Sequence, residues 1–184
     1  WDFIEAPSQM LEEWMWDAET LQKFAVNEAG EVMPADLIAR MQAARFVGKG
    51  LSTRRQMFFA ALSLNYYDQD PARLDLLPTM LEQQRKYSFF DYMDGTHFYA
   101  NFGHLDGYSA IYYTYMWSQT IAEDLFGRFE EGGLRNTALA REYRDKVLAV
   151  GSTRPAADSV ADFLGRSHNM AAFAKRLELS PLGK

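Results

Sequence analysis

The stretch that decides the fold runs from His104 to Trp117 and reads His-Leu-Asp-Gly-Tyr-Ser-Ala-Ile-Tyr-Tyr-Thr-Tyr-Met-Trp. Read as a helix, it places Tyr108, Tyr112 and Tyr115 at positions i, i+4 and i+7, so that their hydroxyls share one face. His104 comes just before that face. One imidazole and three phenols at a helix entrance can donate hydrogen bonds to an oxyanion or to a substrate carbonyl.

The flanking sequence indicates that this helix follows a long loop. Residues 88–107 show no period and contain Gly95, Gly103 and Gly107. Loops of that length inside a compact domain usually carry function. We expect a turn at Asp106-Gly107 and a helix from there to Glu131, which Gly132-Gly133 ends.

The rest of the chain also predicts helices. Apolar residues recur at helical spacing, N-cap residues and prolines precede the repeats, and no strand-like alternation is longer than four residues. The fold class is therefore all-α, an irregular multi-helix bundle of about eight helices within a single domain over 1–184. The other expected helices are 1–16, a short one capped by Asp17, one starting at Pro34, 51–65, one from Asp70 to Lys86 broken by Pro78, one capped by Asn136, 155–164 and 170–177.

A simpler interpretation of the aromatic stretch is a packed core. Aromatic residues at helical spacing are more often buried than functional, and Tyr113, Trp117, Ile121 and Leu125 would form the buried stripe. Spacing alone favours this interpretation.

Composition excludes several classes of protein. The 184 residues carry a net charge of −6 and no basic cluster, which argues against nucleic-acid binding. There is no cysteine, so disulfide scaffolds and thiolate metal sites are excluded, and we expect a cytoplasmic protein. No apolar run approaches the ~20 residues of a membrane span, so no membrane partner is expected.

Several motifs together resemble the thimet oligopeptidase, neurolysin and dipeptidyl carboxypeptidase family of zinc peptidases. The likeness covers nearly the whole chain in the family's order. The matching segments are Phe-Gly-His-Leu-x-Gly-Tyr at 102–108, Tyr-Tyr-x-Tyr-x-Trp-Ser at 112–118, Trp-Asp-Phe-Ile-Glu-Ala-Pro-Ser-Gln at 1–9, Asp-Leu-Phe at 124–126 and Asp-Phe-Leu-Gly-Arg at 162–166.

The resemblance implies a role for each matching residue. Glu5 matches the third zinc ligand, a carboxylate that suits zinc beside two imidazoles. His104 resembles the histidine that contacts substrate near the scissile bond, and Tyr115 resembles the tyrosine that hydrogen-bonds the oxyanion. Tyr108 and Tyr112 resemble tyrosines that line the site and bind peptide backbone.

Other candidates follow from the loop and from charge. Gly103 and Gly107 lie in the family's substrate-binding loop, which is one glycine shorter here than in better-known members, so the placement of His104 relative to Tyr108 is less firmly implied. Gln9 and Glu12 share a helical face with Glu5 and are candidates to support it. Arg54, Arg55 or Arg85 could hold a peptide carboxylate, and nothing in the sequence selects one of them.

The family's His-Glu-x-x-His motif, which supplies two zinc ligands and the general base, is absent from this sequence. The resemblance places that motif upstream of Trp1. We therefore expect the C-terminal part of a catalytic domain that hydrolyses short peptides and needs the upstream part of the same domain as its partner. Alone, the chain should be inactive and should not hold zinc tightly. The alternative is a non-catalytic helical domain that binds or complements another polypeptide.

Overall fold

The computed structural model describes residues 1–178. Over this range the chain is all-α, as the sequence predicts, with ten α-helices, two 3₁₀ helices and one π-helical turn. The β-type pairing in the described range is an isolated bridge between Val26 and Val32.

The chain divides into two compact units. Unit 1 contains Trp1–Asp2 and Gly50–Trp117, and unit 2 contains Phe3–Lys49 and the chain from Ser118 onward. Each unit is described by itself, and the single domain expected over 1–184 stays a prediction.

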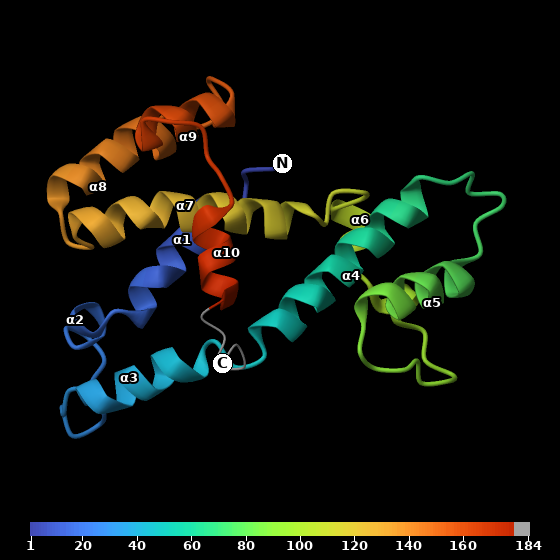
Figure 1. The fold of residues 1–184 in the computed structure, drawn as a ribbon, viewed down its shortest axis with the longest axis horizontal. Helices are drawn as coiled ribbons and strands as arrows, with labels where there is room; N and C mark the ends of the chain where they lie inside the picture. The colour runs from blue at the N-terminus through green and yellow to red at the C-terminus, as the bar shows by residue number, and fades with distance from the viewer. Residues whose placement is uncertain (179–184) are drawn as a thin grey trace. The chain divides into compact units, whose positions relative to one another are not determined.

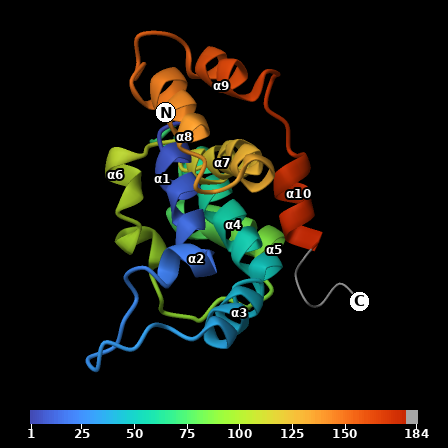
Figure 2. The same ribbon diagram turned by 90° about the vertical axis from the view of Figure 1, so that its left-hand side faces the viewer.

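Unit 2 is built from short helices packed on one long helix, α7 (Thr114–Gly132), whose first four residues belong to unit 1. In this unit α7 lies between α1 and α10 (Figure 2). The helices that accompany α7 in unit 2 are α1 (Ala6–Leu11), the 3₁₀ helix η1 (Glu12–Trp16), α2 (Ala18–Leu21), α3 (Ala35–Ala44), α8 (Thr137–Tyr143), the π-helical turn η3 (Arg144–Leu148), α9 (Ala156–Leu164) and α10 (Ala171–Glu178) (Figure 1).

Local sequence signals set the ends of these helices. Pro7 lies in the first turn of α1, where its missing N–H breaks no helical hydrogen bond. Asp17 caps α2 as predicted, because its carboxylate accepts a hydrogen bond from the backbone N–H of Thr20 at 2.8 Å. Asn136 caps α8 in the same way through the N–H of Ala138. Two terminal helices predicted over 155–164 and 170–177 are confirmed as α9 and α10.

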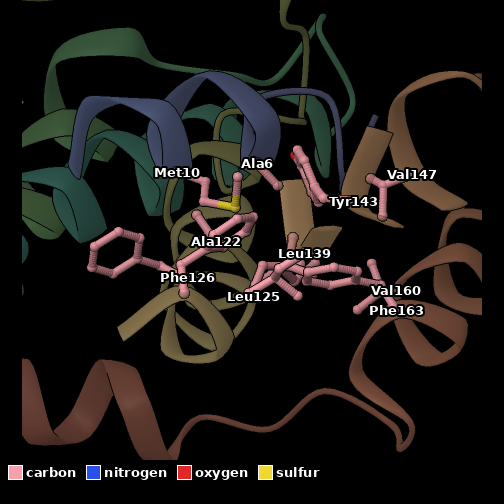
Figure 3. Packing of buried hydrophobic residues seen from close by; sticks show 12 residues of the cluster. Ala6, Met10, Ala122, Leu125, Phe126, Leu139, Tyr143, Val147, Val160 and Phe163 are labelled. Atoms are coloured by element: carbon pink, nitrogen blue, oxygen red, sulfur yellow. The ribbon is translucent and has the colours of Figure 1, made fainter. Parts of the chain in front are cut away.

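The core of unit 2 joins α1, α7, α8 and α9 (Figure 3). Met10 of α1 and Leu125 of α7 are fully buried, and burial of each such side chain is worth about 1.5–3 kcal/mol. The buried members of this cluster are Ala6, Met10, Ile121, Ala122, Leu125, Phe126, Phe129, Leu139, Tyr143, Val147, Val160 and Phe163.

A buried ion network holds α3 and α10 in unit 2. The carboxylate of Glu13, only 6 % exposed, accepts a hydrogen bond at 2.8 Å from Arg45, the C-cap residue of α3, and pairs with Arg176 of α10 at 2.9 Å. Arg176 also pairs with Glu123 of α7. Removing one partner from a buried pair typically costs about 3–5 kcal/mol, so this network is expected to fix the position of both helices within the unit.

Unit 1 has a second core, formed by α4 (Lys49–Tyr67), α5 (Leu76–Tyr87) and the segment that follows α5. Leu62 and Met80 are at most 1 % exposed, and Phe102 and Tyr112 pack with them. The helices of this unit, besides the start of α7, are α4 (Lys49–Tyr67), α5 (Leu76–Tyr87), the 3₁₀ helix η2 (Phe98–Asn101) and α6 (His104–Gly107).

Two predicted helix starts in unit 1 are wrong. The helix expected from Asp70 begins at Leu76, and Pro78 lies in its first turn rather than breaking it. A proline lacks the N–H that later helical positions need, so the helix starts close to it. The helix expected after Asp106-Gly107 begins only at Thr114, because residues 104–107 form α6 and residues 108–113 form turns.

Across residues 1–178 we find no helix with the length and apolar character needed to span a membrane.

Tyr143 provides a test of the unit 2 core. Its side chain is 4 % exposed, and among the described residues its hydroxyl has no hydrogen-bond partner. A buried unpaired hydroxyl typically costs about 1–3 kcal/mol, so Tyr143→Phe is expected to stabilise the chain by about 1 kcal/mol in urea unfolding at neutral pH.

The same substitution should flatten the alkaline pH dependence. Burial raises the pKa of Tyr143 from its usual 10.0 to about 12, so folding keeps this proton on and the unfolded chain releases it first. The free energy of unfolding therefore does not depend on this group below the usual phenol pKa, and it falls as pH rises from there toward the pKa of the folded state. If the free energy of unfolding falls equally between pH 10 and pH 12 in wild type and in Tyr143→Phe, the raised pKa of Tyr143 is wrong.

Candidate functional site

The structure brings four predicted site residues together in unit 1. The ring centroid of His104 lies 5.0 Å from that of Tyr112 and 5.7 Å from that of Tyr115. Tyr108 completes the group, 5.7 Å from His104 and 5.6 Å from Tyr115. We call these four side chains the ring cluster.

The ring cluster does not form on one helical face, as the sequence spacing suggested. His104 lies at the start of α6, which closes where the N–H of Tyr108 donates to the His104 carbonyl at 2.7 Å. The backbone then turns, with Ala110 at a φ of 60°. That left-handed conformation costs roughly 1–2 kcal/mol for a residue other than glycine. Tertiary contacts must hold this turn, and the regular helix α7 then begins at Thr114, one residue before Tyr115.

Tyr112 is the buried member of the cluster. Its side chain is 7 % exposed, and its ring packs edge-on against Phe59 at 5.5 Å and at a steep angle against Phe102 at 5.3 Å. Its hydroxyl donates to the side-chain oxygen of Gln56 on α4 at 3.1 Å. Burial raises the pKa of the Tyr112 phenol, so it stays protonated and its proton is engaged with Gln56.

The other three members are more accessible. His104 is exposed, and Tyr108 and Tyr115 are half-buried. The rings of Tyr108 and Tyr115 stack with an interplanar angle of 21°. These three side chains therefore form the solvent side of the cluster, with Tyr112 behind them.

Helix α4 supports the backbone around the cluster. The hydroxyl of Tyr67 donates to the carbonyl of Leu105 at 2.6 Å, and that of Ser63 donates to the carbonyl of Tyr108 at 3.4 Å. α6 and the start of the turn are thereby tied to a 19-residue helix.

The two candidate glycines of the loop have ordinary backbone conformations. Gly103 lies before α6 and Gly107 ends it, and a Cβ at either position would meet no atom within 4 Å. Gly95 has a φ of 80°, so only this one of the three needs glycine for its conformation. The loop is also longer than the predicted 88–107, since irregular backbone continues to Tyr113.

Glu5 belongs to unit 2 and is described there. The helix expected over 1–16 begins at Ala6, so Glu5 is its N-cap residue, and its backbone carbonyl accepts from the N–H of Gln9 at 2.9 Å. Its side chain is half-exposed. Glu12 starts the 3₁₀ helix that follows, so the single helical face proposed for Glu5, Gln9 and Glu12 ends there.

Glu5 provides a single carboxylate, a side chain of the type that zinc accepts beside imidazoles. Within residues 1–178 there is no group of three or more His, Asp or Glu side chains that could hold a metal ion. Zinc binding by the half-exposed Glu5 stays a prediction.

The structure distinguishes the three candidate arginines. Arg54 is engaged, because it donates to the carbonyls of Tyr87 at 3.0 Å and of Lys86 at 2.7 Å. Arg85 lines a pocket of about 220 Å³ at the end of α5. Arg55 is exposed and lies over the ring of Phe59 at 5.3 Å, and Phe59 is one of the rings that pack against Tyr112.

Sequence reasoning missed three polar residues of this site. Gln56 holds Tyr112, Asp2 accepts a hydrogen bond from Tyr113, and Thr114 bonds to the first residue of the chain. Gln56 lies outside the family-like segments, whereas Asp2 and Thr114 lie within those at 1–9 and 112–118 but have no role assigned by the resemblance. The hydrogen bonds of Gln56 and Asp2 join positions 56 and 111 residues apart. Tyr113, interpreted as a core residue from its spacing, is half-buried with a bonded hydroxyl.

Comparison with known proteins gives the class of this chain. It matches Peptidase family M3 over residues 1–179, and it belongs to that family. It is 31 % identical over 183 residues to the thimet-like oligopeptidase of Dictyostelium discoideum, covering 97 % of this chain and 27 % of that protein.

Two further relatives are similar over nearly the whole chain. Identity is 35 % over 186 residues to saccharolysin of Saccharomyces cerevisiae, covering 97 % of this chain and 26 % of that protein. It is 30 % over 177 residues to oligopeptidase A of Escherichia coli, covering 94 % of this chain and 26 % of that protein. The chain thus spans about a quarter of the length of the curated relatives it matches.

The bond between Gln56 and Tyr112 predicts a coupled effect on stability. Gln56→Leu should destabilise the chain by about 1–3 kcal/mol, because it leaves a buried phenol unpaired. Tyr112→Phe on its own should cost less, since Gln56 is half-buried and its amide can turn toward water. In the double variant the phenol is gone as well, so most of the Gln56→Leu loss should disappear.

Urea unfolding of the four proteins measures this cycle. Strictly additive losses would mean that the two side chains do not depend on each other.

Proposed function

We propose that this chain supplies the third zinc ligand and the substrate-binding and oxyanion-binding side chains of a zinc-dependent oligopeptidase that hydrolyses short peptides. The observation that carries the proposal is the ring cluster. One imidazole and three phenols converge in a chain that belongs to Peptidase family M3.

Glu5 is the zinc ligand in this proposal. Zinc held there would supply a Lewis acid that can polarise a peptide carbonyl and lower the pKa of a water molecule. The two histidine ligands and the general base would come from a His-Glu-x-x-His helix in the upstream part of the same catalytic domain. That upstream part is the proposed partner of this chain, which alone is expected to be inactive.

Tyr115 is the proposed oxyanion donor. Its ring is half-buried on the solvent side of the cluster, next to the exposed His104. A phenol held in a fixed position can donate a hydrogen bond to the negative charge that develops on the carbonyl oxygen. His104 contacts the substrate near the scissile bond and shares this task.

Tyr108 and Tyr112 have different parts in the proposal. Tyr108 stacks on Tyr115, and from the half-buried side of the cluster it can bind the peptide backbone. Tyr112 already donates its proton to Gln56, so it acts through its position, as the buried ring on which His104 and Tyr115 rest.

The test is Tyr115→Phe in the complete peptidase. This change removes one oxygen and keeps the ring, so the packing of the cluster should survive. Loss of one oxyanion donor typically lowers kcat by about 10²–10³-fold, roughly 2.7–4 kcal/mol. KM should move little, because the lost interaction belongs to the transition state.

Steady-state hydrolysis of a short quenched fluorescent peptide measures both constants. Tyr143→Phe, the same chemical change in the core of unit 2, is the matched control and should keep the wild-type kcat. A kcat for Tyr115→Phe within about threefold of wild type would remove Tyr115 from the oxyanion site.

A further inference from the structure

The first two residues of the chain belong to unit 1, although the residues that follow them belong to unit 2. Their contacts explain this assignment. The hydroxyl of Tyr113 donates to the Asp2 carboxylate at 2.6 Å, and the hydroxyl of Thr114 donates to the carbonyl of Trp1 at 2.6 Å. The ring of Trp1 packs on Tyr108 at 5.4 Å and 69°.

Two of these contacts fall on the turn between α6 and α7, and the third falls on the residue that follows the turn. Tyr108 begins the turn, Tyr113 ends it, and Thr114 is the first residue of α7. Thr114 is 0 % exposed, so its bond to Trp1 is shielded from water. The hydrogen bond from Tyr113 goes to a carboxylate, and such charge-assisted bonds are about twice as strong as neutral ones.

The turn is therefore held by two different segments of the chain. Gln56 of α4 holds Tyr112, and Asp2 near the start of the chain holds the next residue, Tyr113. Adjacent residues with separate anchors leave the backbone little freedom to rotate. Since Ala110 keeps an unfavourable φ of 60° in this segment, such anchors are needed to maintain the turn.

The anchored residues stand next to those of the proposed function. Tyr113 comes two residues before Tyr115, and Asp2 comes three residues before Glu5. Tyr113 itself faces Asp2, and its hydrogen bond to that carboxylate raises the pKa of its phenol. It therefore remains a neutral donor at physiological pH.

We propose that Asp2 is a positioning residue that acts through Tyr113: it ties the first two residues of the chain to the turn leading into Tyr115 and so sets the orientation of Tyr115. The expected effect of Asp2 on catalysis rests on the proposed function. The tie itself lies wholly within unit 1 and can be tested without activity.

The first experiment reads the tie directly by amide hydrogen exchange in this chain. Asp2→Ala and Tyr113→Phe should each speed exchange at residues 111–117 by about tenfold or more, because each removes a bond to a charged group. Asp2→Asn keeps an acceptor oxygen and should restore most of the protection. Asp91→Ala, an exposed aspartate in the loop of unit 1, is the matched control and should change nothing at 111–117.

Unchanged exchange at residues 111–117 in Asp2→Ala would overturn the tie. So would equal changes in Asp2→Ala and in Asp91→Ala.

The second experiment reads its effect on catalysis in the complete peptidase. Asp2→Ala and Tyr113→Phe should each lower kcat by about tenfold with little change in KM, and the double variant should be no worse than the poorer single one. Additive losses, or a rise in KM at constant kcat, would overturn the positioning role.

Tyr115→Phe distinguishes failure of the proposed function from failure of the positioning role of Asp2. If Tyr115→Phe leaves kcat unchanged, the proposed function fails, and the exchange experiment still decides whether the tie exists. If Tyr115→Phe lowers kcat while Asp2→Ala and Tyr113→Phe do not, the positioning inference alone fails.

Discussion

The anchoring of Tyr112 is the constraint on which the ring cluster depends. A phenol that is 7 % exposed costs stability unless it is hydrogen-bonded, and Gln56 provides the partner from α4. Packing against Phe59 and Phe102 fixes the plane of the ring. His104 and Tyr115 both lie 5.0 Å from it, so their positions follow from that of a side chain whose own chemistry is already satisfied.

Within the ring cluster, the buried Tyr112 supports the other rings, and His104, Tyr108 and Tyr115 are the accessible members. Regular helix would have placed Tyr108, Tyr112 and Tyr115 in a row along one face. The turn at 108–113 instead stacks Tyr108 on Tyr115, with the exposed His104 beside both rings. A turn of this kind has no helical hydrogen-bond ladder of its own, so its geometry depends on tertiary bonds from two other segments of the chain.

The sequence predicts what local interactions determine and misses what distant ones determine. The caps at Asp17 and Asn136 and the terminal helices follow from signals within a few residues, and the all-α fold follows from them. The proximity of the three tyrosines was also predicted, but for the wrong reason. The prediction assumed a helix through residues 108–115, whereas the helix begins only at Thr114, because tertiary anchors override the helical spacing there. Gln56 gave no signal, and the family-like segment at 1–9 contains Asp2 without assigning it a role, because the partner of an amide or a carboxylate becomes visible only when the chain has folded. Which residues carry catalysis stays a proposal, supported by family membership and by the convergence of the rings.

The central claim is that His104 packs on Tyr112 and Tyr115 through a turn and not along a helix. Nuclear Overhauser contacts between assigned ring protons of this chain test it most directly. The account predicts cross-peaks from the His104 ring to the rings of Tyr112 and Tyr115, with the His97–Tyr99 pair, 5.8 Å apart, as an internal reference. Sequential helical contacts through residues 108–113, together with no cross-peak between His104 and Tyr112, would contradict it.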